Sequence, residues 1–264
     1  MSSFDTNHDQ VVYNFADKQS KGAFLTKVFG MMFICLLITT VVAAGVGYGF
    51  QTLLINTAVT DASTGEVIFN QNLVQGLLVA LGVSVIALLV MSFYLPISFA
   101  RGRHNILIPL LIYVVLMGLL LSTFTFMFDW VILVEAFGIT AIVFGVMGFL
   151  GYISKGRLVG IGGILSSLIL GALLLSLVNY IMIFVTGTIS QTNATLSWIV
   201  SLAIFAFLML VTLYDVYRIK RIAEAGAGNN NNLVYYCAYI LYSDFISILI
   251  RVIYYLGIFS NRRN

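Results

Sequence analysis

Two acidic residues, Asp215 and Asp244, lie inside long apolar stretches near the C-terminal end of the chain. Placing a carboxylate in hydrocarbon costs at least about 2.5 kcal/mol, so a carboxylate found there usually serves a function and has a partner. Ser247 and Arg251 follow Asp244 on the same face of a helix, because 3.6 residues make one turn. We therefore expect the chemistry of this protein at Asp215 and Asp244.

The composition shows which elements must position these residues. Of the 264 residues, 61% are hydrophobic and 9% are charged, which excludes a soluble globular domain. Seven apolar runs are long enough to cross the hydrocarbon core as helices, at 24–50, 74–95, 106–128, 131–153, 160–186, 198–217 and 233–259. Their uninterrupted apolar blocks differ from the alternating pattern of a membrane barrel. We predict an all-α polytopic membrane bundle of seven transmembrane helices at 24–259, with terminal tails at 1–23 and 260–264.

The basic residues predict the orientation of this bundle. Lysine and arginine precede the first run and follow the second, fourth and sixth, whereas the loops after the first, third and fifth runs contain neither. The positive-inside rule therefore places the N-terminus in the cytoplasm. Arg262 and Arg263 break the pattern, because seven crossings would put them outside. Either this tail is an exception, or the last segment enters and returns without crossing.

The last run has a polar face, which favours a position in the middle of the bundle rather than against lipid. If the runs start and end at the interfaces, Asp215 and Asp244 differ in depth by about two turns. A tilt of the last helix, or an earlier start below the hydrocarbon, would bring them level. Small residues let helices approach closely in lipid, so we expect packing at three glycine clusters, Gly45/Gly49, Gly138/Gly145/Gly148 and Gly160/Gly162/Gly163.

Missing residues disfavour an enzyme. An intramembrane serine protease needs a membrane-embedded histidine, and both His8 and His104 lie outside the apolar runs. A two-aspartate intramembrane protease would need a glycine-rich motif where Phe245 follows Asp244, and a retinal protein would need a lysine in the last run. No grouping of Cys, His and Asp has metal-ligand spacing. We expect no catalytic residues, no cofactor, no resident metal and no nucleic-acid partner.

Two segments resemble the signature segments of the Bax inhibitor-1 family: Leu213-Tyr214-Asp215 with Ile219-Lys220, and Leu241-Tyr242-Ser243-Asp244-Phe245-Ile246 with Arg251 and Gly257. Further similarity spans 25–259 and includes the segment around Glu135 and the pair Gly151-Tyr152. Ser243 and Ser247 depart from the family pattern, in which leucine and asparagine are expected.

The resemblance implies a function for the two aspartates. In family members the last helix is surrounded by the other six, and the two aspartates are hydrogen-bonded near the cytoplasmic side, where they sense pH and gate a slow calcium leak. Two carboxylates in a low-dielectric site resist ionising together, so they are expected to share one proton. Loss of that proton would bias the bundle between two packings. The expected charge partners are Arg218, Arg251, Arg101 and Arg103, and the expected ion path includes Glu135 and Ser247.

Two other interpretations stay open. Some bacterial relatives are thought to restrain a membrane-bound protease without transporting ions, and the polar segment at 2–20 would then be a contact segment. Alternatively, the aspartate pair merely fixes helix packing. In each case we expect a multi-pass protein of a bacterial plasma membrane, in contact with the lipid bilayer.

Overall fold

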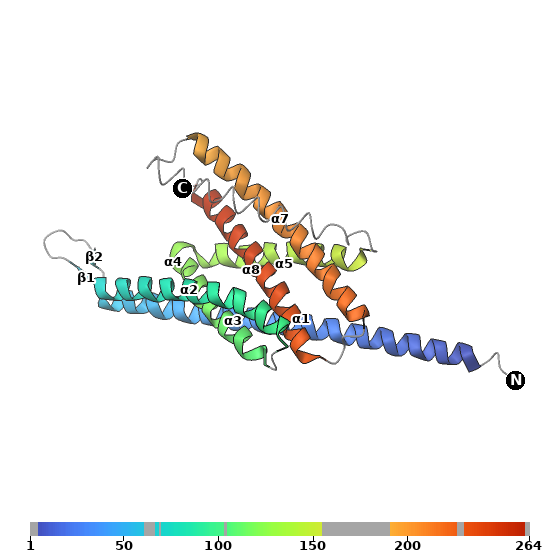
Figure 1. Cartoon of the computed structure of the whole chain (residues 1–264). Helices are drawn as coiled ribbons and strands as arrows, with labels where there is room; N and C mark the ends of the chain where they lie inside the picture. The colour runs from blue at the N-terminus through green and yellow to red at the C-terminus, as the bar shows by residue number, and fades with distance from the viewer. Residues whose placement is uncertain are drawn as a thin grey trace. The chain divides into compact units, whose positions relative to one another are not determined.

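The structure is a computed structural model that describes residues 5–60, 67–68, 70–102, 105–154, 191–225 and 230–261. Its long elements in these ranges are helices: α1 (Asp5–Thr57), α2 (Gln71–Ala100), α3 (Leu107–Leu121), α4 (Phe124–Met127), α5 (Trp130–Ile153), α7 (Gln191–Glu224) and α8 (Asn231–Asn261) (Figure 1). Two short antiparallel strands, β1 (Val59–Thr60) and β2 (Val67–Ile68), depart from the all-α prediction. Their β-branched residues suit a strand pair in the polar loop after α1.

Six helical segments are long and apolar enough to cross a membrane: Lys21–Thr57, Gln71–Ala100, Leu107–Met127, Trp130–Ile153, Ile199–Glu224 and Asn231–Gly257. They confirm six of the seven predicted runs, while the run at 160–186 lies outside the described residues. The segment in α8 is 61% buried, whereas the other five are between 11% and 33% buried. Among the described spans, the last helix is therefore the one with the most protein around it.

The ends of α7 and α8 differ from the predicted boundaries. The predicted sixth run ended at 217, but α7 continues to Glu224, and α8 begins at Asn231, two residues before the predicted start. Arg218 and Lys220 end the apolar run because they are charged, but both are good helix formers, so the helix continues through them. The sequence pattern therefore located the end of the apolar run rather than the end of the helix.

The described residues divide into two groups, each packed internally. The first group contains the start of α1, α5 from Ala136, α7, and α8 from Ser243. The second contains α1 from Lys18, α2, α3, α4, the first turns of α5, and α8 as far as Tyr242. Both aspartates belong to the first group.

The core of the second group contains a buried hydroxyl pair. The hydroxyl oxygens of Thr39 on α1 and Tyr242 on α8 are 2.6 Å apart, and both side chains are buried. Thr39 also donates to the carbonyl of Cys35, at 2.9 Å. The ring of Tyr113 on α3 meets the Tyr242 ring edge to face. This polar contact joins α1 to α8 within the core of the second group.

The close helix contacts occur at glycines other than the predicted ones. A Cβ at Gly118 would lie 2.7 Å from Val42 Cβ, so α1 and α3 pack against each other there. Gly47 and Gly151 make similarly close approaches. In contrast, a Cβ at Gly45, Gly49, Gly138 or Gly145 would meet no atom of the described chain within 4 Å, and one at Gly148 would lie 3.9 Å from its nearest neighbour. Among the described residues, the closest helix contacts therefore lie at Gly47, Gly118 and Gly151, Gly148 makes an ordinary contact, and the cluster at 160–163 lies outside the described residues.

Candidate functional site

The side chains of Asp215 on α7 and Asp244 on α8 are hydrogen-bonded to each other. Two carboxyl groups can form such a bond only if at least one of them is protonated, because a carboxylate has no proton to donate. The other oxygen of Asp244, Oδ2, is buried and has no hydrogen-bond partner in the described part of the chain. This arrangement allows the two carboxyl groups to share a proton.

The extension of α7 brings the two aspartates to similar levels. Asp215 lies nine residues before Glu224, or about 14 Å at 1.5 Å per residue, and Asp244 lies thirteen residues after Asn231, or about 20 Å. The hydrogen bond between the two carboxyl groups places the two residues at matching levels, although the apolar runs predicted an offset of about two turns.

Helix α5 supports α7 beside Asp215. A Cβ at Gly151 would overlap the Leu213 carbonyl oxygen and lie 3.2 Å from Val216 Cβ. Only glycine lets the α5 backbone approach the α7 backbone this closely. Leu213 and Val216 flank Asp215 in sequence, so the contact fixes the segment of α7 that carries the carboxyl group.

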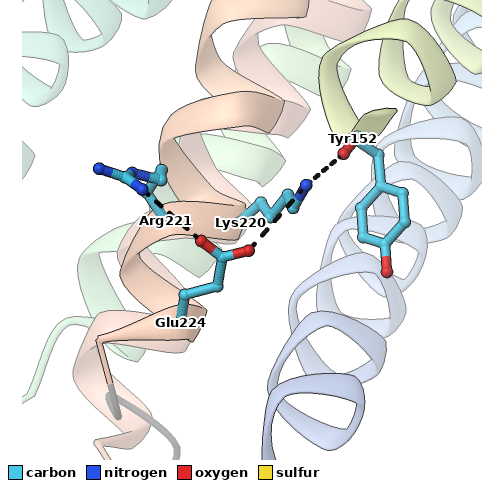
Figure 2. Close-up of polar contacts among 4 residues, drawn as sticks. All are labelled: Tyr152, Lys220, Arg221 and Glu224. Carbon is cyan, nitrogen blue, oxygen red and sulfur yellow. Dashed lines mark hydrogen bonds and ion pairs between the residues drawn. The ribbon is translucent and has the colours of Figure 1, made fainter. Parts of the chain in front are cut away.

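A second contact between α5 and α7 lies one turn further along α7 (Figure 2). The Nζ of Lys220 donates a 2.6 Å hydrogen bond to the carbonyl oxygen of Tyr152 and lies 5.0 Å from the centre of that residue's ring. Glu224 lies 4.0 Å from both Lys220 and Arg221. The Tyr152 carbonyl is among the last four of α5, which have no partner within the helix, so Lys220 caps the end of α5.

Helix α8 also packs on α5 next to its aspartate. The ring of Phe245 lies 5.4 Å from that of Phe137 and 5.5 Å from that of Phe144, measured between ring centres. Phe245 is fully packed, with 3% of its surface exposed. Helix α5 therefore contacts both helices of the Asp215–Asp244 pair.

The expected charge partners occupy different places. Arg218 is exposed on α7, where its charge acts on Asp215. Arg251 instead donates from Nη1 to the hydroxyl of Ser201, at 3.1 Å, and that hydroxyl lies 3.0 Å from the Tyr255 hydroxyl. In the described chain the Arg251 guanidinium has no carboxylate partner. Arg101 is exposed at the end of α2, and Arg103 lies outside the described residues.

The expected path residues also differ in their surroundings. Glu135 is exposed near the start of α5. Ser247 is half-buried, and its hydroxyl donates to the carbonyl of Ser243 one turn earlier in α8. Sequence reasoning missed the roles of Gly151, Lys220, Ser201 and Tyr255 in helix contacts. Lys220 stands in a family-like segment, but no sequence pattern indicates that its partner is a backbone carbonyl of α5.

Comparison with known proteins decides the family. Residues 21–261 match the family described as inhibitor of apoptosis-promoting Bax1. The chain belongs to the Bax inhibitor-1 family. Inner membrane protein YbhL of Escherichia coli K12 is 29% identical to this Bax inhibitor-1 protein over 245 residues, which cover 91% of the chain and 92% of YbhL. YbhL of Escherichia coli O6:H1 is similar to the same extent.

Family membership confirms two sequence predictions. The resemblance drawn from the segments around Asp215 and Asp244 is correct, and the match extends over nearly the same residues. The chain is a multi-pass integral membrane protein, and its relative YbhL is a bacterial inner membrane protein.

Proposed function

We propose that this Bax inhibitor-1 protein is a pH-responsive calcium leak, in which the protonation of Asp215 and Asp244 decides between a closed and an open packing of α7 and α8. The hydrogen bond between the two carboxyl groups is the observation that carries the proposal. It joins one helix to the other and exists only while the pair holds a proton.

The energy of losing this proton is large enough to move helices. Two negative charges about 4 Å apart repel by about 4 kcal/mol at an effective dielectric constant of 20. That energy corresponds to roughly a thousandfold change in an equilibrium between two packings, since 1.36 kcal/mol is a factor of ten. Protonation at a single site therefore suffices to control the state of the bundle.

The ionised pair would also suit the proposed ion. Calcium prefers oxygen ligands and takes six to eight of them, so two carboxylates can attract it without retaining it. In this proposal Asp215 and Asp244 lie at the cytoplasmic end of the path, because the positive-inside rule places the basic end of α7, with Arg218, Lys220 and Arg221, in the cytoplasm. Ser247 and Glu135 are the proposed path residues towards the other side, with α8 at the centre of the bundle.

The positions of the arginines indicate which of them could pair with the ionised aspartates. Arg218 is the first candidate to stabilise the ionised pair, because its charge already acts on Asp215. Arg251 would have to leave Ser201 before it could reach Asp244. Arg101 and Arg103, in the loop before α3, are proposed as alternative partners in the open packing.

Calcium entry into liposomes containing the purified protein tests this function, measured between about pH 5 and 8. Asp215→Asn and Asp244→Asn keep the shape of a protonated carboxyl group but cannot ionise, so each should flatten the pH response. Asp129→Asn is the matched control, because it removes an exposed carboxylate outside the pair. Flux that keeps its full pH response in both pair variants would refute the sensor.

Absence of flux at any pH would favour the non-transporting alternative, in which the protein binds and restrains a membrane-bound protease. Helix α1 is continuous from Asp5 into the first span, so residues 5–20 of the polar segment form a helical extension of a membrane helix, suited to such a contact. Deletion of this segment should then abolish co-purification with the protease, whereas the leak function predicts unchanged calcium flux.

A further inference from the structure

Helix α5 contacts α7 both before and after Asp215 along the chain. On one side, the backbone of Gly151 lies against Leu213 and Val216, which flank the aspartate. On the other side, Lys220 reaches from α7 to the carbonyl of Tyr152. One contact is steric and the other is polar, and together they hold this stretch of α7 against the end of α5.

Lys220 behaves differently from the neighbouring cation on the same helix. Its side chain is 22% exposed and bonds to another helix, whereas the Arg221 side chain is 60% exposed and pairs with Glu224 on its own helix (Figure 2). A cation at a helix C-terminus interacts favourably with the helix dipole, and an ammonium makes a strong, charge-assisted hydrogen bond. The Tyr152 ring adds a cation–π contact.

We propose that Lys220 is a positioning residue that ties the end of α5 to α7 and thereby holds Asp215 in place for its hydrogen bond with Asp244. Helices α5 and α7 then move together near the aspartate pair. Ionisation of the pair would separate α8 from α7. The inference deepens the proposed function and rests on it for the consequence for calcium flux. The tie between α5 and α7, and its effect on the pair, can be tested without flux.

Several charged or titratable groups surround this tie. Asp215 faces Asp244 on α8 and Arg218 on α7. Lys220 faces Tyr152 on α5 and Glu224 on α7. Since Lys220 bonds away from the aspartates, its replacement should act on the pair through the position of α7.

A disulfide cross-link measures the tie directly. A Cβ at Gly148 lies 3.9 Å from Val216 Cγ2, so Gly148→Cys with Val216→Cys places two thiols within reach of a disulfide. The natural cysteines, Cys35 and Cys237, are both buried and would be replaced by alanine. We expect Lys220→Met to slow cross-linking in membranes several-fold, Lys220→Arg to restore it, and Arg221→Met, the matched control, to leave it unchanged.

The second readout is the titration of the aspartate pair. Infrared spectroscopy detects the protonated carboxyl groups, and loss of the band in Asp215→Asn assigns it to the pair. Lys220→Met should move the midpoint to lower pH by about one unit, because a loosened pair loses hydrogen-bond energy that held the shared proton. Arg221→Met should not move it.

The outcomes separate the two proposals. Unchanged cross-linking in Lys220→Met overturns the tie, whatever the flux measurements show. Slower cross-linking with an unmoved titration midpoint overturns the positioning role, because Lys220 would then only support the fold. A protein with no calcium flux but with both expected Lys220 effects would refute the leak and keep this inference.

Discussion

Substitution of Gly151 by alanine tests whether the backbones of α5 and α7 meet beside Asp215. A Cβ at this position would overlap the Leu213 carbonyl oxygen and lie 3.2 Å from Val216 Cβ. Carbon atoms pack best about 3.5–4.0 Å apart, so the helices would have to separate by at least about 0.3 Å to relieve the contact with Val216, and by more to clear the oxygen.

Two opposing effects determine the size of the change. Alanine is favoured over glycine inside a helix by about 1 kcal/mol. Overpacking a close contact costs about 1–3 kcal/mol, and here the neighbour is backbone, which cannot rotate out of the way. We expect a net loss of about 1 kcal/mol or more for Gly151→Ala, and a melting temperature lower by roughly 2–4 °C for each kcal/mol.

Thermal unfolding of the detergent-purified protein measures this effect. The matched control is Gly148→Ala, one turn earlier on α5, where a Cβ would lie 3.9 Å from Val216 Cγ2, an ordinary contact. The control should keep or raise the melting temperature, because it gains helix propensity without overlap. A Gly151→Ala protein as stable as the Gly148→Ala protein would refute the close approach of the two backbones.

Two further pairs of substitutions are expected to have unequal effects on the two partners of one contact. Thr39→Val should cost about 1–3 kcal/mol, because it leaves the Tyr242 hydroxyl buried without its 2.6 Å partner, whereas Tyr242→Phe should cost about 1 kcal/mol, because Thr39 still donates to the Cys35 carbonyl. Equal melting temperatures for these two variants would contradict the asymmetry. Ser201→Ala should lower the melting temperature by taking a partner from Arg251, whereas Arg251→Met should be near neutral, because it removes a half-buried charge whose described partner is a hydroxyl. A larger loss in Arg251→Met than in Ser201→Ala would show that the charge itself stabilises the fold.

The membrane architecture could be predicted because hydrocarbon imposes a simple rule on the chain. Each apolar run must be about 20 residues long and helical, which located six described spans. The same rule predicted the end of α7 too early. The charges of Arg218 and Lys220 end the apolar run, but the high helix propensity of both residues lets the helix continue.

The candidate site could be predicted only in part. Asp215 and Asp244 stand out because a carboxylate in an apolar run is rare, and their partner had to be polar. The support of the site by Gly151 and Lys220 depends on which face of α5 turns towards α7. Because α5 contains several glycines, the sequence alone does not show which of them lies against α7. Arg251 shares a face with Asp244 on α8, yet it bonds to Ser201 on α7, because a long side chain finds the nearest acceptor on the neighbouring helix.

In the proposed function, Asp215 and Asp244 act as one proton-sensing unit that controls calcium flux. The most direct measurement is the pH dependence of calcium entry into liposomes for the native protein, both single asparagine variants and the double variant Asp215→Asn/Asp244→Asn. A single unit predicts that the double variant loses no more of the pH response than either single variant, because each single change already abolishes the shared proton. Losses that add independently, or a full pH response in the double variant, would contradict the account.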